Sequence, residues 1–194
     1  MASAFAQLLS QVRGCTLCAD ALAQGVRPVL QADPRARILV AGQAPGSKVH
    51  ASGVPFDDPS GVRLRAWMGV TSEIFYNPST IALVPMGFCY PGRGRSGDLP
   101  PRPICAETWR ARLLAAMPDI KLTLAIGQYA QAWHVPEPAG NLTETVRQWR
   151  RCGDAVIPLP HPSPRNNLWL RKNPWFEAEV VPVVQARVRA LLNG

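Results

Sequence analysis

The sequence has no long apolar segment, and this absence excludes membrane-spanning proteins from consideration. No stretch approaches the roughly 20 consecutive apolar residues that a helix needs to cross a bilayer, although 47% of the residues are hydrophobic. The N-terminal residues Met-Ala-Ser-Ala-Phe-Ala-Gln contain neither the basic region nor the apolar block of a signal peptide. We therefore expect a folded, cytoplasmic protein with no membrane partner.

Lysine is also scarce, since it occurs only at positions 48, 121 and 172. Nearly all of the 21 basic residues are therefore arginine, and with 13 acidic residues the formal net charge is +8. Arginine presents a planar, two-pronged fork that matches phosphate, so this composition favours a polyanionic partner. A GC-rich genome would enrich arginine, alanine, proline and glycine as well, and the charge alone leaves the partner undecided.

The five cysteines have an informative order. Disulfides are rare in the cytosol, and the count is odd. Cys15 and Cys18 form a chelating pair, whereas fifteen residues separate Cys89 from Cys105. Structural zinc usually takes two tight pairs, while a tight pair with a wide pair is compatible with an all-thiolate iron–sulfur cluster. We expect these four to be metal ligands and Cys152 to be the spare, with zinc or buried free thiols as the alternatives.

Four short apolar runs, each followed by glycine or proline, predict buried parallel strands. The strands are expected at 37–41, 80–84, 122–126 and 155–159, and helices at roughly 3–13, 60–69, 104–117, 128–134, 142–150 and 173–192. This alternation implies an α/β protein: a three-layer α/β/α sandwich with a central, mostly parallel four-stranded sheet. The 194 residues fit one domain, 1–194. Trp109, Leu113 and Met117 should face the sheet, and Pro182 should kink or shorten the last helix.

Three turns directly follow predicted strands, and ligands of such sheets collect beyond the carboxyl ends of the strands. The turns begin at Gly42, Pro85 and His161, so we expect them to converge on one cleft. In the first, Gly42-Gln-Ala-Pro-Gly46, small residues allow backbone amides to approach a ligand. Phe56 offers a stacking surface, and Asp58 stands before a predicted helix. An ordinary strand-to-helix loop with capping residues is the alternative.

The third turn reads His161-Pro-Ser-Pro-Arg-Asn-Asn-Leu-Trp169. The His161 imidazole can donate to an oxyanion that develops on a leaving base. Ser163 and Arg165 can bind phosphate, and Leu168 or Trp169 can wedge into a stack of bases. A proline-rich turn with a surface histidine is the alternative interpretation.

With these motifs together, the sequence resembles the uracil-DNA glycosylase superfamily from Cys15 to about Trp169. The strand followed by Gly42-Gln-Ala-Pro-Gly46 is similar to the first motif of that superfamily, and His161-Pro-Ser is similar to the second. The cysteine order is similar to that of the iron–sulfur branches, called families 4 and 5.

The resemblance implies a monomer that acts on DNA and hydrolyses the N-glycosidic bond of deoxyuridine. It also implies a [4Fe–4S] cluster on Cys15, Cys18, Cys89 and Cys105. Family 4 has a Glu where Gln43 stands. Family 5 has an Asp before a Ser-Gly helix start, as at Asp58. The implied catalytic carboxylate is therefore Asp58, with Gln43 as the second choice.

The resemblance also implies the contacts with the base. Backbone amides of Gln43 and Ala44 would bind uracil oxygens, Phe56 would stack on the base, and His161 would stabilise its negative charge. Family 4 reads the base with an Asn near the position of Pro85. Gln43 in place of an acid, together with Pro85 at that position, leaves a non-catalytic DNA-binding protein as the main alternative. A glycosylase for hypoxanthine or xanthine and an iron–sulfur sensor are the other two alternatives.

Overall fold

The computed structural model describes residues 3–95 and 97–193. Its centre is a sheet of four parallel strands in the order β2-β1-β3-β4. The strands are β1 (Ile38–Ala41), β2 (Ile81–Leu83), β3 (Leu122–Ile126) and β4 (Val156–Leu159). Helices cover both faces of the sheet, so nearly every strand position is buried. This explains why the strands are continuous apolar runs rather than alternating patterns. The predicted fold class and strand positions are confirmed.

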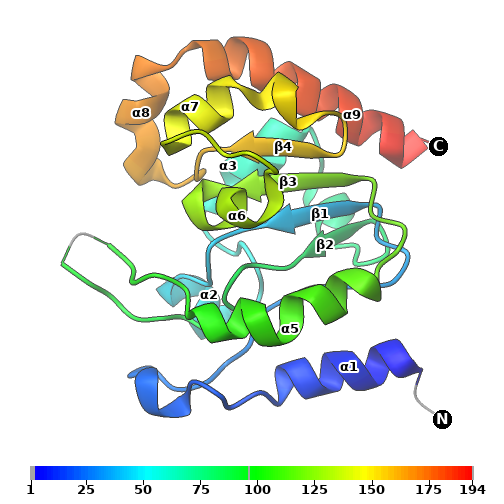
Figure 1. The fold of residues 1–194 in the computed structure, drawn as a ribbon, viewed down its shortest axis with the longest axis vertical. Helices are drawn as coiled ribbons and strands as arrows, with labels where there is room; N and C mark the ends of the chain where they lie inside the picture. The colour runs from blue at the N-terminus through cyan, green and yellow to red at the C-terminus, as the bar shows by residue number, and fades with distance from the viewer. Residues whose placement is uncertain (1–2, 96, 194) are drawn as a thin grey trace.

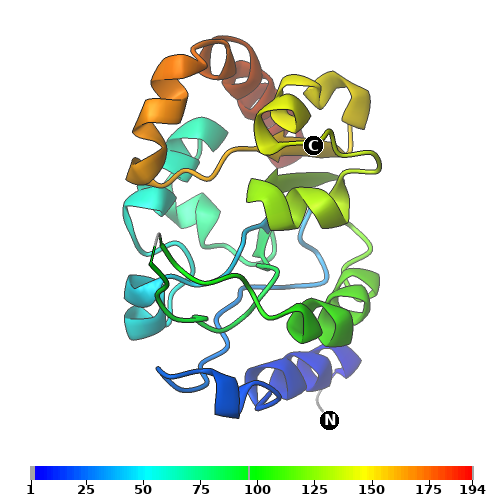
Figure 2. The same ribbon diagram turned by 60° about the vertical axis from the view of Figure 1, so that its left-hand side comes forward.

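Two apolar clusters lie on opposite faces of the sheet (Figures 1 and 2). The first joins Ile38 and Val40 of β1 to helices α3 (Pro59–Met68) and α9 (Val181–Asn193). The second joins Leu39 and Ala41 to α1 (Ala4–Arg13) and α5 (Pro103–Ala115). Neighbouring residues of one strand thus enter different clusters, as the period of two in a strand requires. Trp109, Leu113 and Met117 are buried in the second cluster, as predicted.

The remaining helices are short. They are α2 (Ser47–Ser52), α4 (Ser72–Phe75), α6 (Gly127–His134), α7 (Leu142–Arg147) and α8 (Asn167–Lys172), with 3₁₀ turns at Ala19–Ala21, Trp149–Cys152 and Pro164–Asn166. The sequence did not predict α2, α4 or α8. The expected helix over 142–150 is divided between α7 and the turn at Trp149–Cys152. No helix in the described part of the chain is long and apolar enough to span a membrane.

The last predicted helix, 173–192, is interrupted before its proline. Phe176–Val180 is π-helical, and α9 begins at Val181, so Pro182 lies in the first turn of α9. A proline inside a helix removes one backbone hydrogen bond and crowds the preceding turn. Helix irregularities of this kind often take the form of a π-helical turn. The helix expected over 173–192 is therefore not one continuous α-helix, and its π-helical segment ends just before Pro182.

Candidate active site

A cleft of about 320 Å³ opens at the carboxyl edge of the sheet. Its lining includes Gly42–Gly46, which follows β1, Pro85, which follows β2, and His161, which follows β4. The predicted convergence of the three turns is confirmed. Figures 1 and 2 show that the segment 90–102 also reaches this edge, between α2 and α8. The strand order changes direction beside β1, and ligand sites of open α/β sheets lie where the order reverses.

The Gly42–Gly46 turn is held by an extension of the sheet pairing. Met86 N donates to Gly42 O at 2.8 Å, and Gly87 N donates to Gln43 O at 3.0 Å. A Cβ on Gly42 would lie 3.3 Å from Phe56 Cζ, so a larger residue there would crowd the ring. Gln43 Nε2 donates to Leu99 O at 3.4 Å. The turn is therefore fixed on one side by the end of β2 and on the other by the segment 90–102.

Phe56 lies in the wall of the cleft with an unusual backbone conformation. Its φ is 55°, and its ring meets Phe75 edge-on at 6.0 Å between centroids. A Cβ on Gly61 would lie 1.8 Å from the Phe56 carbonyl oxygen. Glycine at 61 is therefore required for α3 to pack beneath this turn, and the Ser60-Gly61 helix start fixes the position of Phe56.

Asp58 is the N-cap of α3, and its Oδ1 accepts a hydrogen bond from Gly61 N at 2.9 Å. Asp58 therefore does cap a helix, as the alternative interpretation of this loop expected. It does not remove the carboxylate from the cleft, because Asp58 is half-buried and lines it. Capping fixes the carboxyl group in one orientation, so the same residue serves the helix and the cleft.

His161 follows β4 after one proline, and its ring is ordered by its own turn. Ser163 N donates to His161 Nδ1 at 3.2 Å, so Nδ1 is the acceptor and the neutral imidazole carries its proton on Nε2. Burial lowers the pKa of His161, and the negative charges of Asp58 and Asp98 oppose this effect. The site therefore offers a neutral N–H donor close to two carboxylates.

The turn that contains His161 is tied to α3 and to its own backbone. Asn166 Nδ2 donates to His161 O at 2.7 Å. Arg63 of α3 donates to Ser163 O at 3.1 Å and to Asn167 Oδ1 at 2.7 Å. The sequence gave no indication of Arg63, because a charged residue on a helix carries no sign that its side chain reaches a distant turn.

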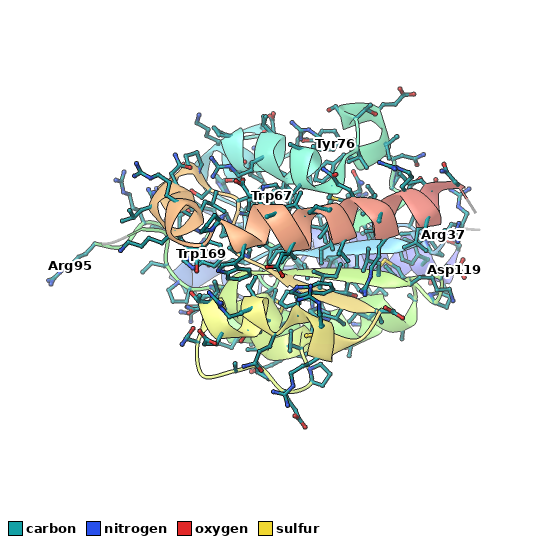
Figure 3. The ribbon with its side chains drawn as sticks, turned by 90° about the horizontal axis from the view of Figure 1, so that it is seen from above. Arg37, Trp67, Tyr76, Arg95, Asp119 and Trp169 are labelled. Carbon is teal, nitrogen blue, oxygen red and sulfur yellow. The ribbon has the colours of Figure 1, made fainter. Side chains whose placement is uncertain are left out.

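The side chains that follow His161 differ in how far they are exposed to the cleft and to solvent. Ser163 lines the cleft, and its Oγ accepts from Arg165 N at 3.3 Å. Arg165 also lines the cleft and is exposed. Leu168 is 55% exposed. Trp169 instead donates from Nε1 to Thr143 Oγ1 at 2.8 Å and is half-buried (Figure 3).

Trp169 packs among other aromatic rings of the first apolar cluster. Its centroid lies 5.9 Å from that of Trp175 and 5.8 Å from that of Phe176. A side chain held in this way is not free to enter a stack of bases. The structure therefore favours Leu168 over Trp169 as the apolar side chain that this turn presents outward.

A buried arginine, also missed, supports the cleft wall at the end of β2. Arg110 of α5 is fully buried and donates to Val84 O at 3.1 Å and Pro85 O at 3.0 Å. Its Nε donates to His134 Nε2 at 3.0 Å. Burial lowers the pKa of Arg110 to about 10, and burial with the neighbouring guanidinium lowers the pKa of His134 to about 3. His134 is therefore a neutral acceptor for a buried cation.

Four cysteines from distant segments line a second, mostly apolar pocket. They are Cys15, Cys18, Cys89 and Cys105. Trp109 Nε1 donates to Cys15 Sγ at 3.2 Å, and Phe88 N donates to Cys105 Sγ at 3.4 Å. Burial raises the pKa of Cys89, and raises that of Cys105 to about 12.

The fifth cysteine, Cys152, lies elsewhere, in a depression with Val135 and Gln148. The structure thus separates the four predicted ligands from the spare. Among residues 3–95 and 97–193, no three His, Cys, Asp or Glu side chains are placed to hold a single metal ion.

The sequence model of the uracil DNA glycosylase superfamily matches residues 30–185. The chain belongs to this superfamily. The match covers the cleft residues from Gly42 to Arg165, including Asp58 and His161. It includes Cys89 and Cys105 but begins after Cys15 and Cys18, so membership in the uracil DNA glycosylase superfamily does not select the iron–sulfur branches. In general terms, membership implies a glycosylase that acts on DNA, without choosing the base.

Proposed function

We propose that this protein removes uracil from DNA by hydrolysing the N-glycosidic bond. The observation that carries the proposal is the pairing, in one cleft, of a neutral His161 with its proton on Nε2 and the oriented carboxylate of Asp58. An N–H donor suits the base that leaves with negative charge, and a carboxylate suits the sugar that becomes positive. Membership in the superfamily supports the same reaction class.

The base reaches the cleft only after it leaves the DNA stack, which costs a few kcal/mol. In the proposed complex the extruded uracil stacks on Phe56, beside the Gly42–Gly46 turn. The backbone amides of Gln43 and Ala44 donate to its carbonyl oxygens. Gly42 and Gly61 let the ring and the carbonyl of Phe56 pack closely into the wall of the cleft, and this packing fixes the flat ring on which the base would stack.

In the reaction the bond between C1′ of the sugar and N1 of uracil breaks, and its electron pair leaves with the base. His161 Nε2–H donates a hydrogen bond to the uracil oxygen on which negative charge grows. The Asp58 carboxylate stabilises the cationic sugar and orients a water molecule, whose oxygen bonds to C1′. The proton lost by that water passes to Asp58 and then to solvent, and the uracil anion is protonated from solvent. The products are free uracil and an abasic site.

Cations in and beside the cleft support a DNA-binding face there, around the two carboxylates, Asp58 and Asp98, that also line it. The three ion pairs within residues 3–95 and 97–193 join Arg35 to Asp33, Arg150 to Glu179 and Arg187 to Asp154, and none of these residues lines the cleft. Lys48 and Arg165 line it. Arg95 extends from the segment 90–102 away from the body of the molecule (Figure 3). In the proposal these cations contact phosphates, and Leu168 fills the gap that the extruded base leaves.

We also propose that the four grouped cysteines hold a [4Fe–4S] cluster. They line one apolar pocket, and two of their sulfur atoms receive N–H donors. When bound, the cluster would cross-link the N-terminal segment, the loop that follows β2, and α5.

The cluster proposal is tested by metal analysis of protein purified without oxygen. We expect four irons and four sulfides per chain, which is the composition of a [4Fe–4S] cluster. Cys89→Ser should lower the iron content, and Cys152→Ser should leave it unchanged. One zinc per chain, or equal iron loss in both variants, would contradict the proposal.

The glycosylase proposal is tested by single-turnover release of uracil from single- and double-stranded oligonucleotides. Wild type should release uracil and leave an abasic site, whereas His161→Leu should be slower by about 10²- to 10³-fold, as when one oxyanion donor is removed. No release by wild type, with salt-sensitive binding to DNA retained, would favour a non-catalytic DNA-binding protein.

A further inference from the structure

Asp98 is a second carboxylate of the cleft, and the sequence motifs gave no indication of it. It lies in a hairpin within the segment 90–102, where Gly94 N donates to Gly97 O at 2.6 Å and Leu99 N donates to Gly92 O at 2.8 Å. The carboxylate faces the Gly42–Gly46 turn: its Oδ2 would lie 3.7 Å from a Cβ on Gly46. Asp98 lines the cleft and is exposed in the free protein.

Two contacts hold Asp98 in this place. The hydroxyl of the buried Tyr90 donates to Asp98 Oδ1 at 3.4 Å. Gln43 Nε2 donates to the carbonyl of Leu99, the next residue, at 3.4 Å. A glutamate at 43 would place an acceptor against that carbonyl. The amide at 43 therefore joins the hairpin to the turn that faces the base.

The chemistry of deamination makes a carboxylate at this position informative. An ionised carboxylate only accepts hydrogen bonds. Cytosine N3 and adenine N1 carry lone pairs, whereas the corresponding nitrogens of uracil and hypoxanthine carry hydrogen. A carboxylate thus attracts the deaminated base and repels its parent. A site built to hydrogen-bond one group discriminates strongly against an analogue that lacks it.

We propose that Asp98 is the specificity-determining residue of the cleft and accepts a hydrogen bond from the ring N–H of a deaminated base. This inference rests on the proposed glycosylase function and extends it. Family 4 reads the base with the side-chain amide of an Asn near the position of Pro85, but the proline ring offers no donor or side-chain acceptor. In this proposal Asp98 reads the base instead. One acceptor contacts one N–H and ignores the rest of the ring, so uracil and hypoxanthine both satisfy it.

The test compares Asp98→Asn with wild type on oligonucleotides that carry uracil, hypoxanthine or cytosine. Asparagine can donate as well as accept, so it should tolerate the lone pair of cytosine. We expect the ratio of kcat/KM for uracil to that for cytosine to fall at least tenfold, mainly through KM. Tyr90→Phe should lower the ratio less, and Asp119→Asn, at the opposite edge of the sheet (Figure 3), should leave it unchanged.

A different role for Asp98 would give a different pattern. If Asp98 instead activated water, Asp98→Asn would lower kcat for every base and leave the ratio unchanged, and this result would overturn the inference. Binding of uracil- and cytosine-containing strands is also measured in an Asp58→Asn background, where base release is slow. If wild type releases no base, the proposed function fails. Loss of binding preference on Asp98→Asn would then still support Asp98 as the reader, and retained preference would refute it.

Discussion

Replacement of Asp58 by asparagine separates its two roles, because asparagine caps helices about as well as aspartate. In Asp58→Asn the side-chain oxygen should still accept from Gly61 N, the bond that measures 2.9 Å in wild type. Only the charge is lost. We expect the single-turnover rate of uracil release to fall by about 10²- to 10⁴-fold, the usual range for a positioned acid–base group. The melting temperature should stay within about 1–2 °C of wild type, because asparagine keeps the cap and the half-buried charge is only partly removed from solvent.

Asp58→Ala removes the cap as well as the charge. Loss of an N-cap costs about 1 kcal/mol, which lowers the melting temperature of a protein of this size by about 2–4 °C. Asp57→Asn is the matched control, because Asp57 is exposed and does not line the cleft. Single-turnover kinetics and thermal unfolding of all three variants test the reasoning. An Asp58→Asn protein with wild-type activity would refute the catalytic assignment. If Asp57→Asn released uracil as slowly as Asp58→Asn, the lower rate would result from the change in net charge and not from a specific role of Asp58.

Three further results are expected. Leu168→Ala should slow uracil release from double-stranded DNA more than from single-stranded DNA, because only the duplex must be held open, whereas Trp169→Ala should chiefly lower the melting temperature. Burial lowers the pKa of His161 below its ordinary value of 6.5, so the fall of the single-turnover rate on the acid side should have its midpoint below pH 6.5. A midpoint above 6.5 would contradict a neutral imidazole. Gly61→Ala should destabilise the protein by about 1–3 kcal/mol through overpacking, measured by denaturant unfolding, whereas Gly140→Ala, with nothing within 4 Å of its new Cβ, should not.

The strands could be predicted because a parallel strand buried on both faces must be apolar at every position. The short helices could not. Helix α8 has six residues and no amphipathic repeat. It nevertheless determines that the side chain of Leu168 is exposed and that of Trp169 is half-buried. Adjacent residues of a helix point about 100° apart, so one can face solvent while the other faces the core. When the segment is interpreted as a turn, its sequence gives no reason to expect different positions for Leu168 and Trp169.

The cleft was predictable where its residues directly follow strands, as Gly42 and His161 do. Asp98 was not, because it lies 15 residues after the end of β2 at Leu83 and returns to the cleft through contacts of Tyr90 and Gln43 that no spacing rule anticipates. The grouping of Cys15 with Cys105 likewise depends on the packing of α1 beneath α5. The cysteine spacing only suggested it, and the resemblance to a family with the same order made the expectation specific.

The most direct test of the glycosylase account is the stoichiometry of products when wild-type protein is mixed with an oligonucleotide that contains one uracil. Free base and abasic strand are each quantified, and the same strand with cytosine in place of uracil serves as the control. The account predicts free uracil and abasic sites in equal amounts, and no cytosine release. An unchanged uracil strand, recovered bound to the protein, would contradict it.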